Sequence, residues 1–156
     1  MVLQPGDSAP DINLPALDGS AWNLRAALKE GPVALAFFKI SCPTCQLTFP
    51  FLQRMADSTT NGLRIVAVSQ DDAPDTREFH QRFGVSMSTL TDAAPTYSAS
   101  SAYKITSVPS IFVVETDGRI AWATEGFNKA ALEDLGRRSG VAPFRENDHV
   151  PSLRPG

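Results

Sequence analysis

The residues best suited to chemistry are two cysteines, Cys42 and Cys45, which are the only cysteines in the chain. They lie in the stretch FFKISCPTCQL, where an apolar run over residues 33–38 gives way to a helical pattern of apolar residues. This change of pattern places Cys42 near the N-terminus of a helix and Cys45 one turn further in, on the same face. Two thiols at this spacing can form a disulfide with little movement of the backbone. The spacing therefore predicts a dithiol that opens and closes.

The position of each cysteine in the helix predicts its role. A thiolate, and not a thiol, attacks a disulfide, and a free cysteine with a pKa of about 8.5 is mostly protonated at neutral pH. Unpaired N–H groups and the helix dipole favour an anion at a helix N-terminus, where the pKa of a cysteine can fall to roughly 3.5–7.5. Cys42 is therefore the expected nucleophile, and Cys45 is expected to resolve the mixed disulfide. Pro43 and Thr44, between them, supply neither acid nor base.

Structural and metal-binding uses of the pair stay open. A static disulfide across two residues closes a small loop and gains little chain entropy, and two buried thiols would be inert. A zinc site needs more ligands, and only His80 and His149 could complete a Cys2His2 set. Copper(I) could be held by the two thiols alone. We expect both histidines to be solvated and no metal or organic cofactor to be required, apart from the redox-active cysteine pair.

Length and charge bound the class of protein. A chain of 156 residues can bury about two-thirds of its unfolded surface in one core, so it does not depend on a disulfide for stability. The formal charge is −3, from 14 basic and 17 acidic residues, and no basic cluster is longer than Arg137 and Arg138. This balance argues against nucleic acid or an anionic membrane as a partner. The expected partners are protein thiols and disulfides and an upstream reductant, bound by a monomer.

The sequence shows no pattern typical of a signal peptide or of a membrane-spanning segment. Its longest apolar run is far shorter than the roughly 20 residues that span a bilayer, and residues 1–7 have neither a basic region nor an apolar core of a signal peptide. A full-length chain of this kind is expected in the cytoplasm. If a signal or anchor was removed, we expect a periplasmic or other extracytoplasmic location.

The order of the elements predicts one α/β domain over residues 1–140. Apolar stretches on either side of an Asp-Gly turn predict an N-terminal hairpin over residues 12–24. Apolar periodicity and capping residues predict strands over 33–38, 63–69, 88–91, 108–114 and 120–123, and helices over 25–29, 43–57, 72–83 and 129–138. This order describes a central mixed sheet with helices on both faces.

The composition changes at residue 141. Residues 141–156 have no apolar period and contain Pro143, Pro151 and Pro155. We expect an extended or partly disordered tail, for which Phe144 is the candidate anchor.

Several motifs together resemble the thioredoxin-like superfamily. They are GDSAPD at residues 6–11, the Asp-Gly turn at 18–19, the Phe-Phe pair before CPTC, Pro50, and Val108-Pro109 ahead of a strand. The nearest branch is the TlpA/ResA-like thiol–disulfide oxidoreductases, close to the AhpC/TSA peroxiredoxins, and the resemblance covers residues 6–138. It implies a thioredoxin-like fold and an enzyme that reduces or exchanges protein disulfides.

The resemblance also implies a substrate-binding loop opposite the cysteines. Pro109 would be the cis-proline of that loop, and Val108 would offer backbone pairing to an extended substrate. Pro43 and Thr44, from the CPTC motif, would border the same substrate. A peptide bond before proline is cis in only about 5–6% of cases, so the cis form is an expectation that comes from the resemblance.

Two positions depart from the thioredoxin pattern. Ser41 stands where thioredoxins have tryptophan, and Ala36 stands where they have a buried acid. Proton transfer to Cys45 would then use water, Glu125 or Lys39. A lysine three residues before Cys42 could lower the pKa of that thiol, or it could simply point to solvent.

Peroxidase activity is the main alternative function. Peroxiredoxins carry threonine or serine three residues before the cysteine that reacts with peroxide. If Cys45 were that cysteine, Cys42 would stand in place of this threonine or serine. The peroxiredoxin pattern also has a proline nearby, and this sequence has no proline at the corresponding position. We therefore expect a thiol–disulfide oxidoreductase, with an antioxidant peroxiredoxin as the alternative and a copper or zinc binding module as a weaker one.

Overall fold

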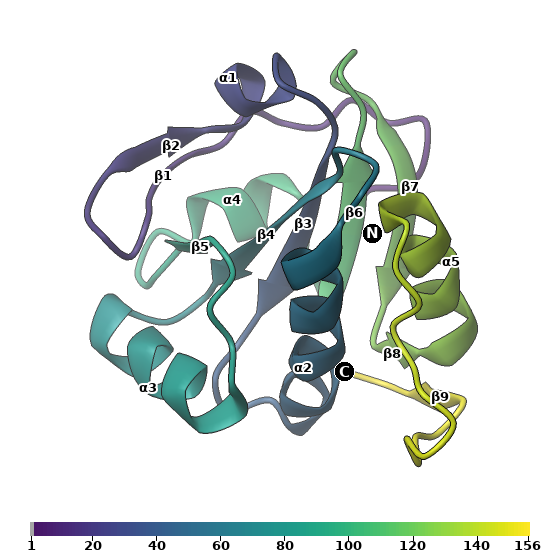
Figure 1. Ribbon diagram of the computed structural model, residues 1–156. Helices are drawn as coiled ribbons and strands as arrows, with labels where there is room; N and C mark the ends of the chain where they lie inside the picture. The colour runs from purple at the N-terminus through teal and green to yellow at the C-terminus, as the bar shows by residue number, and fades with distance from the viewer. Residues whose placement is uncertain (1) are drawn as a thin grey trace.

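In the computed structural model of the protein, a five-stranded mixed sheet forms the centre of the molecule (Figure 1). Its strand order is β5-β4-β3-β6-β7. Strand β3 (Val33–Phe38) pairs in parallel with β4 (Arg64–Ser69), which pairs in parallel with β5 (Thr89–Thr91). Strand β6 (Ser110–Val114) runs antiparallel to both β3 and β7 (Ile120–Glu125). The predicted mixed sheet and its C-terminal hairpin are confirmed.

Helices cover both faces of this sheet because side chains of β3 alternate between two apolar clusters. The bounds of the helices are α1 (Leu24–Leu28), α2 (Pro43–Ser58), α3 (Ala73–Phe83), α4 (Ser98–Ala102) and α5 (Lys129–Ser139). Helices α2, α3 and α5 pack with Ala34, Ala36 and Phe38 on one face. Helices α1 and α4 contribute to the cluster on the other face. Within the described part of the chain, residues 2–156, no helix is long and apolar enough to cross a membrane.

The predicted N-terminal hairpin is also present. Strand β1 (Asn13–Pro15) pairs antiparallel with β2 (Ala21–Asn23), so that Leu14 lies opposite Trp22. Gly19 has a φ of +86°, a backbone conformation that glycine adopts easily in a tight turn. A single bridge from Ala16 to Leu90 joins the hairpin to the edge of the central sheet.

A second small sheet was not predicted. Strand β8 (Phe127–Asn128) pairs antiparallel with β9 (Leu153–Arg154), which belongs to the proline-containing tail. The tail also packs through Phe144, whose ring centroid lies 4.8 Å from that of Phe51 and 6.1 Å from that of Phe127. The end of the chain reaches the N-terminal end of α2, where the cysteines lie (Figure 1). The tail is therefore part of the surroundings of the cysteine pair.

Candidate active site

The turn from β3 into α2 holds both cysteines. Cys42 is the N-cap residue of α2, with an extended backbone, and Pro43 occupies the first turn, where a missing N–H donor costs nothing. The Cys42 sulfur accepts a hydrogen bond of 3.2 Å from the backbone N–H of Cys45. Both residues are free cysteines. The hydrogen bond holds the Cys42 sulfur against the first turn of α2, which contains Cys45.

The two thiols differ in their exposure to solvent. Cys42 is partly exposed, whereas the side chain of Cys45 is 0% exposed. Burial strongly raises the pKa of the Cys45 thiol, the neighbouring Cys42 sulfur raises that pKa further, and a hydrogen bond from the Lys39 backbone opposes the shift. Cys45 therefore keeps its proton at neutral pH. A reagent dissolved in water meets Cys42 first.

A proline loop lies beside Cys42. The Val108–Pro109 peptide bond is cis, as the resemblance implies. The carbonyl oxygen of Val108 accepts a hydrogen bond of 3.4 Å from the Cys42 thiol. Pro109 is buried, and its carbonyl oxygen accepts a 2.8 Å hydrogen bond from the Gly126 N–H, which ties the loop to the segment before β8. The structure thus brings the predicted residues Cys42, Val108 and Pro109 together.

Asp71 supports the turn that carries the cysteines. Its carboxylate accepts a 2.8 Å hydrogen bond from the backbone N–H of Ile40, and its charge also contributes to the raised pKa of Cys45. The sequence does not single out this residue, because an acidic pair before Ala-Pro is typical of a helix cap, and Asp72 alone caps α3. The expected order of the strands could have pointed to Asp71. Asp71 follows β4, the parallel neighbour of β3, and the carboxyl ends of adjacent parallel strands meet at one edge of a sheet.

Lys39 and Glu125 do not reach the thiols through their side chains. Both side chains are exposed, and Glu125 lies at the end of β7, opposite Ser110. Neither side chain makes a hydrogen bond to a cysteine in the part of the chain from Val2 onward. Their roles in tuning a thiol pKa stay predictions.

The two histidines lie in different environments, and one expectation about them is wrong. His80 is partly buried rather than solvated: its Nε2 atom lies 2.9 Å from the Thr89 hydroxyl oxygen, and burial lowers its pKa. His149 is exposed, as expected. Among residues 2–156 no group of three or more histidine, cysteine or acidic side chains is placed to hold a metal ion.

Thr44 connects the cysteine motif to the tail. Its hydroxyl donates a 2.7 Å hydrogen bond to the carbonyl oxygen of Pro155. Thr44 is buried, while Pro43 is exposed at the start of the helix. No sequence signal could have revealed this contact, because the acceptor is a backbone carbonyl in a segment without apolar periodicity.

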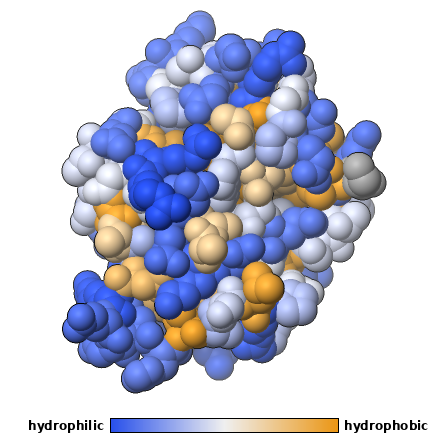
Figure 2. Space-filling view, turned by 90° about the vertical axis from the view of Figure 1, so that its right-hand side faces the viewer, coloured by the Kyte–Doolittle hydropathy of each residue, from blue (hydrophilic) through white to orange (hydrophobic). Residues whose placement is uncertain are grey.

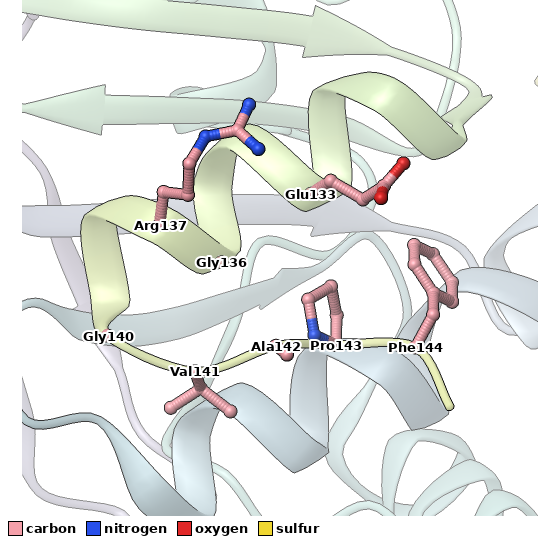
Figure 3. A pocket seen from close by; sticks show the side chains of 8 residues that line it. All are labelled: Glu133, Gly136, Arg137, Gly140, Val141, Ala142, Pro143 and Phe144. Carbon is pink, nitrogen blue, oxygen red and sulfur yellow. The ribbon is translucent and has the colours of Figure 1, made fainter. Parts of the chain in front are cut away.

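A cavity of about 300 Å³ lies away from the cysteines (Figure 3). It is bounded by the C-terminal half of α5 and by residues 140–144, and the side chains of Glu133, Arg137 and Phe144 border it. None of the predicted site residues lines this cavity. This cavity is therefore separate from the cysteine pair at the N-terminus of α2.

Comparison with known proteins agrees with this geometry. Residues 4–137 match the Redoxin family. A Mycobacterium tuberculosis protein named "Putative peroxiredoxin Rv2521" is 31% identical over 134 residues, which cover 78% of this chain and 84% of that protein.

Solved structures of other proteins share the fold. A Chlorobium tepidum protein described as a "putative Thiol:disulfide interchange protein DsbE" matches with a TM-score of 0.75 and 26% identity, over 91% of this chain and 99% of that one. The M. tuberculosis protein dsbF matches with a TM-score of 0.71 and 25% identity, over 83% and 92% of the two chains. The chain is thus an oxidoreductase with a thioredoxin-like fold, and it belongs to the Redoxin family.

Proposed function

We propose that this protein is a thiol–disulfide oxidoreductase that reduces or exchanges disulfides in protein substrates. Cys42 is the attacking thiol and Cys45 the resolving thiol. The observation that carries the proposal is the unequal exposure of the two sulfurs: Cys42 is partly exposed at the N-terminus of α2, and Cys45 is 0% exposed one turn behind it. A substrate can therefore reach the Cys42 thiol directly, whereas the Cys45 thiol is shielded from solvent until the mixed disulfide has formed.

The reaction has two steps. The Cys42 thiolate attacks one sulfur of the substrate disulfide, which forms a mixed disulfide and releases the other substrate sulfur as a thiolate. Cys45 then gives up its proton and attacks the Cys42 sulfur, which releases the second substrate thiol and leaves a Cys42–Cys45 disulfide. An external dithiol reductant restores the reduced pair. Because Cys45 is neutral and buried before the first step, it does not compete with Cys42 for the substrate.

Peroxide reduction is the second candidate, favoured by the 31% identity to a protein whose name includes "peroxiredoxin". In the peroxiredoxin pattern the reactive cysteine would be Cys45, preceded by Cys42 in place of the threonine or serine. The burial of Cys45 weighs against this assignment, because a peroxide molecule in solvent reaches Cys42 first.

The two functions differ in substrate and in the cysteine that each requires. We expect the reduced protein to reduce insulin disulfides with turnover when a dithiol reductant is supplied, and to react with hydrogen peroxide no faster than a simple thiolate does. Stopped-flow measurement of peroxide loss and of insulin reduction checks both expectations. Fast peroxide consumption that is lost in Cys45→Ser but retained in Cys42→Ser would reverse the ranking.

A further inference from the structure

We propose that residues 150–156, here called the tail strap, lie across the docking path of an extended protein substrate and must move away before such a substrate reaches Cys42. Small disulfides reach Cys42 with the tail strap in place. The inference deepens the proposed function, on which it rests, because it concerns access to the same thiol.

The tail strap touches the residues that border the reactive thiol. Thr44, inside the CPTC motif, donates a 2.7 Å hydrogen bond to the Pro155 carbonyl oxygen. Gly156 lies directly against the backbone of Val108, so closely that a Cβ added at residue 156 would overlap the Val108 carbonyl oxygen. That same carbonyl oxygen accepts the hydrogen bond from Cys42. The tail strap thus occupies space beside the reactive sulfur.

The tail strap is bound through its backbone, as an added β-strand is. Within β9, Arg154 pairs with Phe127 and Leu153 pairs with Asn128 of β8, and the Lys129 N–H donates a 2.9 Å hydrogen bond to the Ser152 carbonyl oxygen. Recognition of this kind depends on main-chain hydrogen bonds and accepts many side chains. Residues 151–156 are all exposed, and Leu153 is 67% exposed. Another extended peptide could make the same backbone contacts.

Glycine is required at a second point under the tail strap. A Cβ added at Gly126 would stand 2.7 Å from the Arg154 carbonyl oxygen, and Gly126 has a φ of +69°. The Gly126 N–H is the donor that binds the Pro109 carbonyl oxygen. The proline loop, Gly126 and the tail strap are therefore in direct contact, in one layer beside Cys42.

The segment before the tail strap is anchored much more firmly. The Arg54 guanidinium donates to both carboxylate oxygens of Asp148, at 2.6 and 3.3 Å, and to the Pro143 carbonyl oxygen at 3.0 Å. The hydrogen bond from Arg54 lowers the pKa of Asp148 to about 2, so this ion pair is complete at neutral pH. Residues 141–144 run alongside α5, where a Cβ added at Gly136 would stand 2.6 Å from the Pro143 ring (Figure 3).

The segment before the tail strap is firmly anchored, whereas the tail strap itself is held mainly by backbone contacts. The tail strap can therefore detach while it stays tethered to the domain. The anchored segment keeps the tail strap close to the site, which gives it a high effective concentration there. Val150, at the start of the tail strap, packs on the core cluster, but residues 151–156 are exposed and are bound mainly by backbone hydrogen bonds, each of which contributes little net stability. The face that carries α5 and the end of the chain shows separate apolar patches among hydrophilic residues (Figure 2).

The test compares two probes that share one leaving group. In a Cys45→Ser background, Cys42 attacks either dithiodipyridine or an extended peptide whose cysteine is activated as a pyridyl disulfide. Each reaction forms a disulfide to Cys42 and releases pyridine-2-thione, which is followed by its absorbance. We expect Gly156→Val, and separately deletion of residues 150–156, to raise the rate with the peptide by about tenfold or more and the rate with dithiodipyridine by less than about twofold.

A matched control changes the tail strap without displacing it. The side chain of Ser152 makes no hydrogen bond within residues 2–156, so Ser152→Ala should leave both rates unchanged. Equal rates with the peptide in the Cys45→Ser parent, with Gly156→Val and with the deletion would overturn the proposal. A slower peptide reaction in both variants would also overturn it, because the tail strap would then help to bind substrates. Failure of the wild type to reduce insulin would contradict the proposed function alone, because this test needs no turnover.

Discussion

Replacing Cys42 with serine is expected to lower the rate of protein-disulfide reduction by about 10⁴-fold or more, because a serine hydroxyl is a far weaker nucleophile than a thiolate. The fold should survive this change. Cys42 is the N-cap of α2, a position at which serine is among the preferred residues. Steady-state reduction of insulin, with thermal unfolding measured alongside, separates loss of the nucleophile from loss of structure.

Ser41→Ala is the matched control for this variant. Ser41 is exposed and precedes Cys42 directly, so its replacement changes the same turn without removing a sulfur. We expect its rate to stay within about threefold of the wild type, as for most exposed substitutions away from reacting atoms. If Cys42→Ser retained activity within about tenfold of the wild type, Cys42 would not be the attacking group.

The second large effect is on stability. Phe38→Ala is expected to lower the free energy of unfolding by about 3–5 kcal/mol, the range for removing a buried phenylalanine side chain. Phe38 is 0% exposed, and its ring centroid lies 4.3 Å from that of Phe49 and 4.9 Å from that of Phe79. The ring joins β3, α2 and α3 in one cluster directly before the turn that leads to Cys42.

Phe83→Ala is the control for the aromatic cluster. The Phe83 ring lies 4.8 Å from that of Phe79, but Phe83 is only partly buried at the end of α3. Its replacement should cost about 1 kcal/mol, since less surface returns to water. Chemical denaturation of the reduced proteins measures both values. Equal losses in the two variants would contradict the view that Phe38 is the centre of this cluster.

Local patterns in the sequence were enough to predict the central fold. An apolar run with no polar interruption predicted β3 as a strand buried on both faces, and all of its residues are buried. Capping residues set the ends of α3: Asp72 caps its start, and Gly84, with a φ of +66°, ends it. These features are predictable because each depends on residues close together in the chain.

Features that depend on distant residues were missed. Asp71 reaches the backbone of Ile40 only because β3 and β4 lie side by side, and β8 pairs with β9 across the whole C-terminal helix and tail. The contacts of β9 and Pro155 are made by backbone atoms, which no side-chain pattern reports. His80 is partly buried, and its Nε2 atom lies 2.9 Å from the hydroxyl oxygen of Thr89 in β5, a contact between residues nine positions apart that the helical pattern alone does not report.

The roles of the two thiols are tested most directly by trapping the intermediate on Cys42. The Cys45→Ser variant is mixed with an oxidised protein substrate, and the adduct is located by mass spectrometry of the intact protein and its peptides. Because the resolving thiol is absent, a mixed disulfide should accumulate at Cys42 in nearly stoichiometric amounts, and no adduct should form in Cys42→Ser. A substrate adduct on Cys45 in the Cys42→Ser variant, with none on Cys42 in Cys45→Ser, would contradict the assignment of the two thiols.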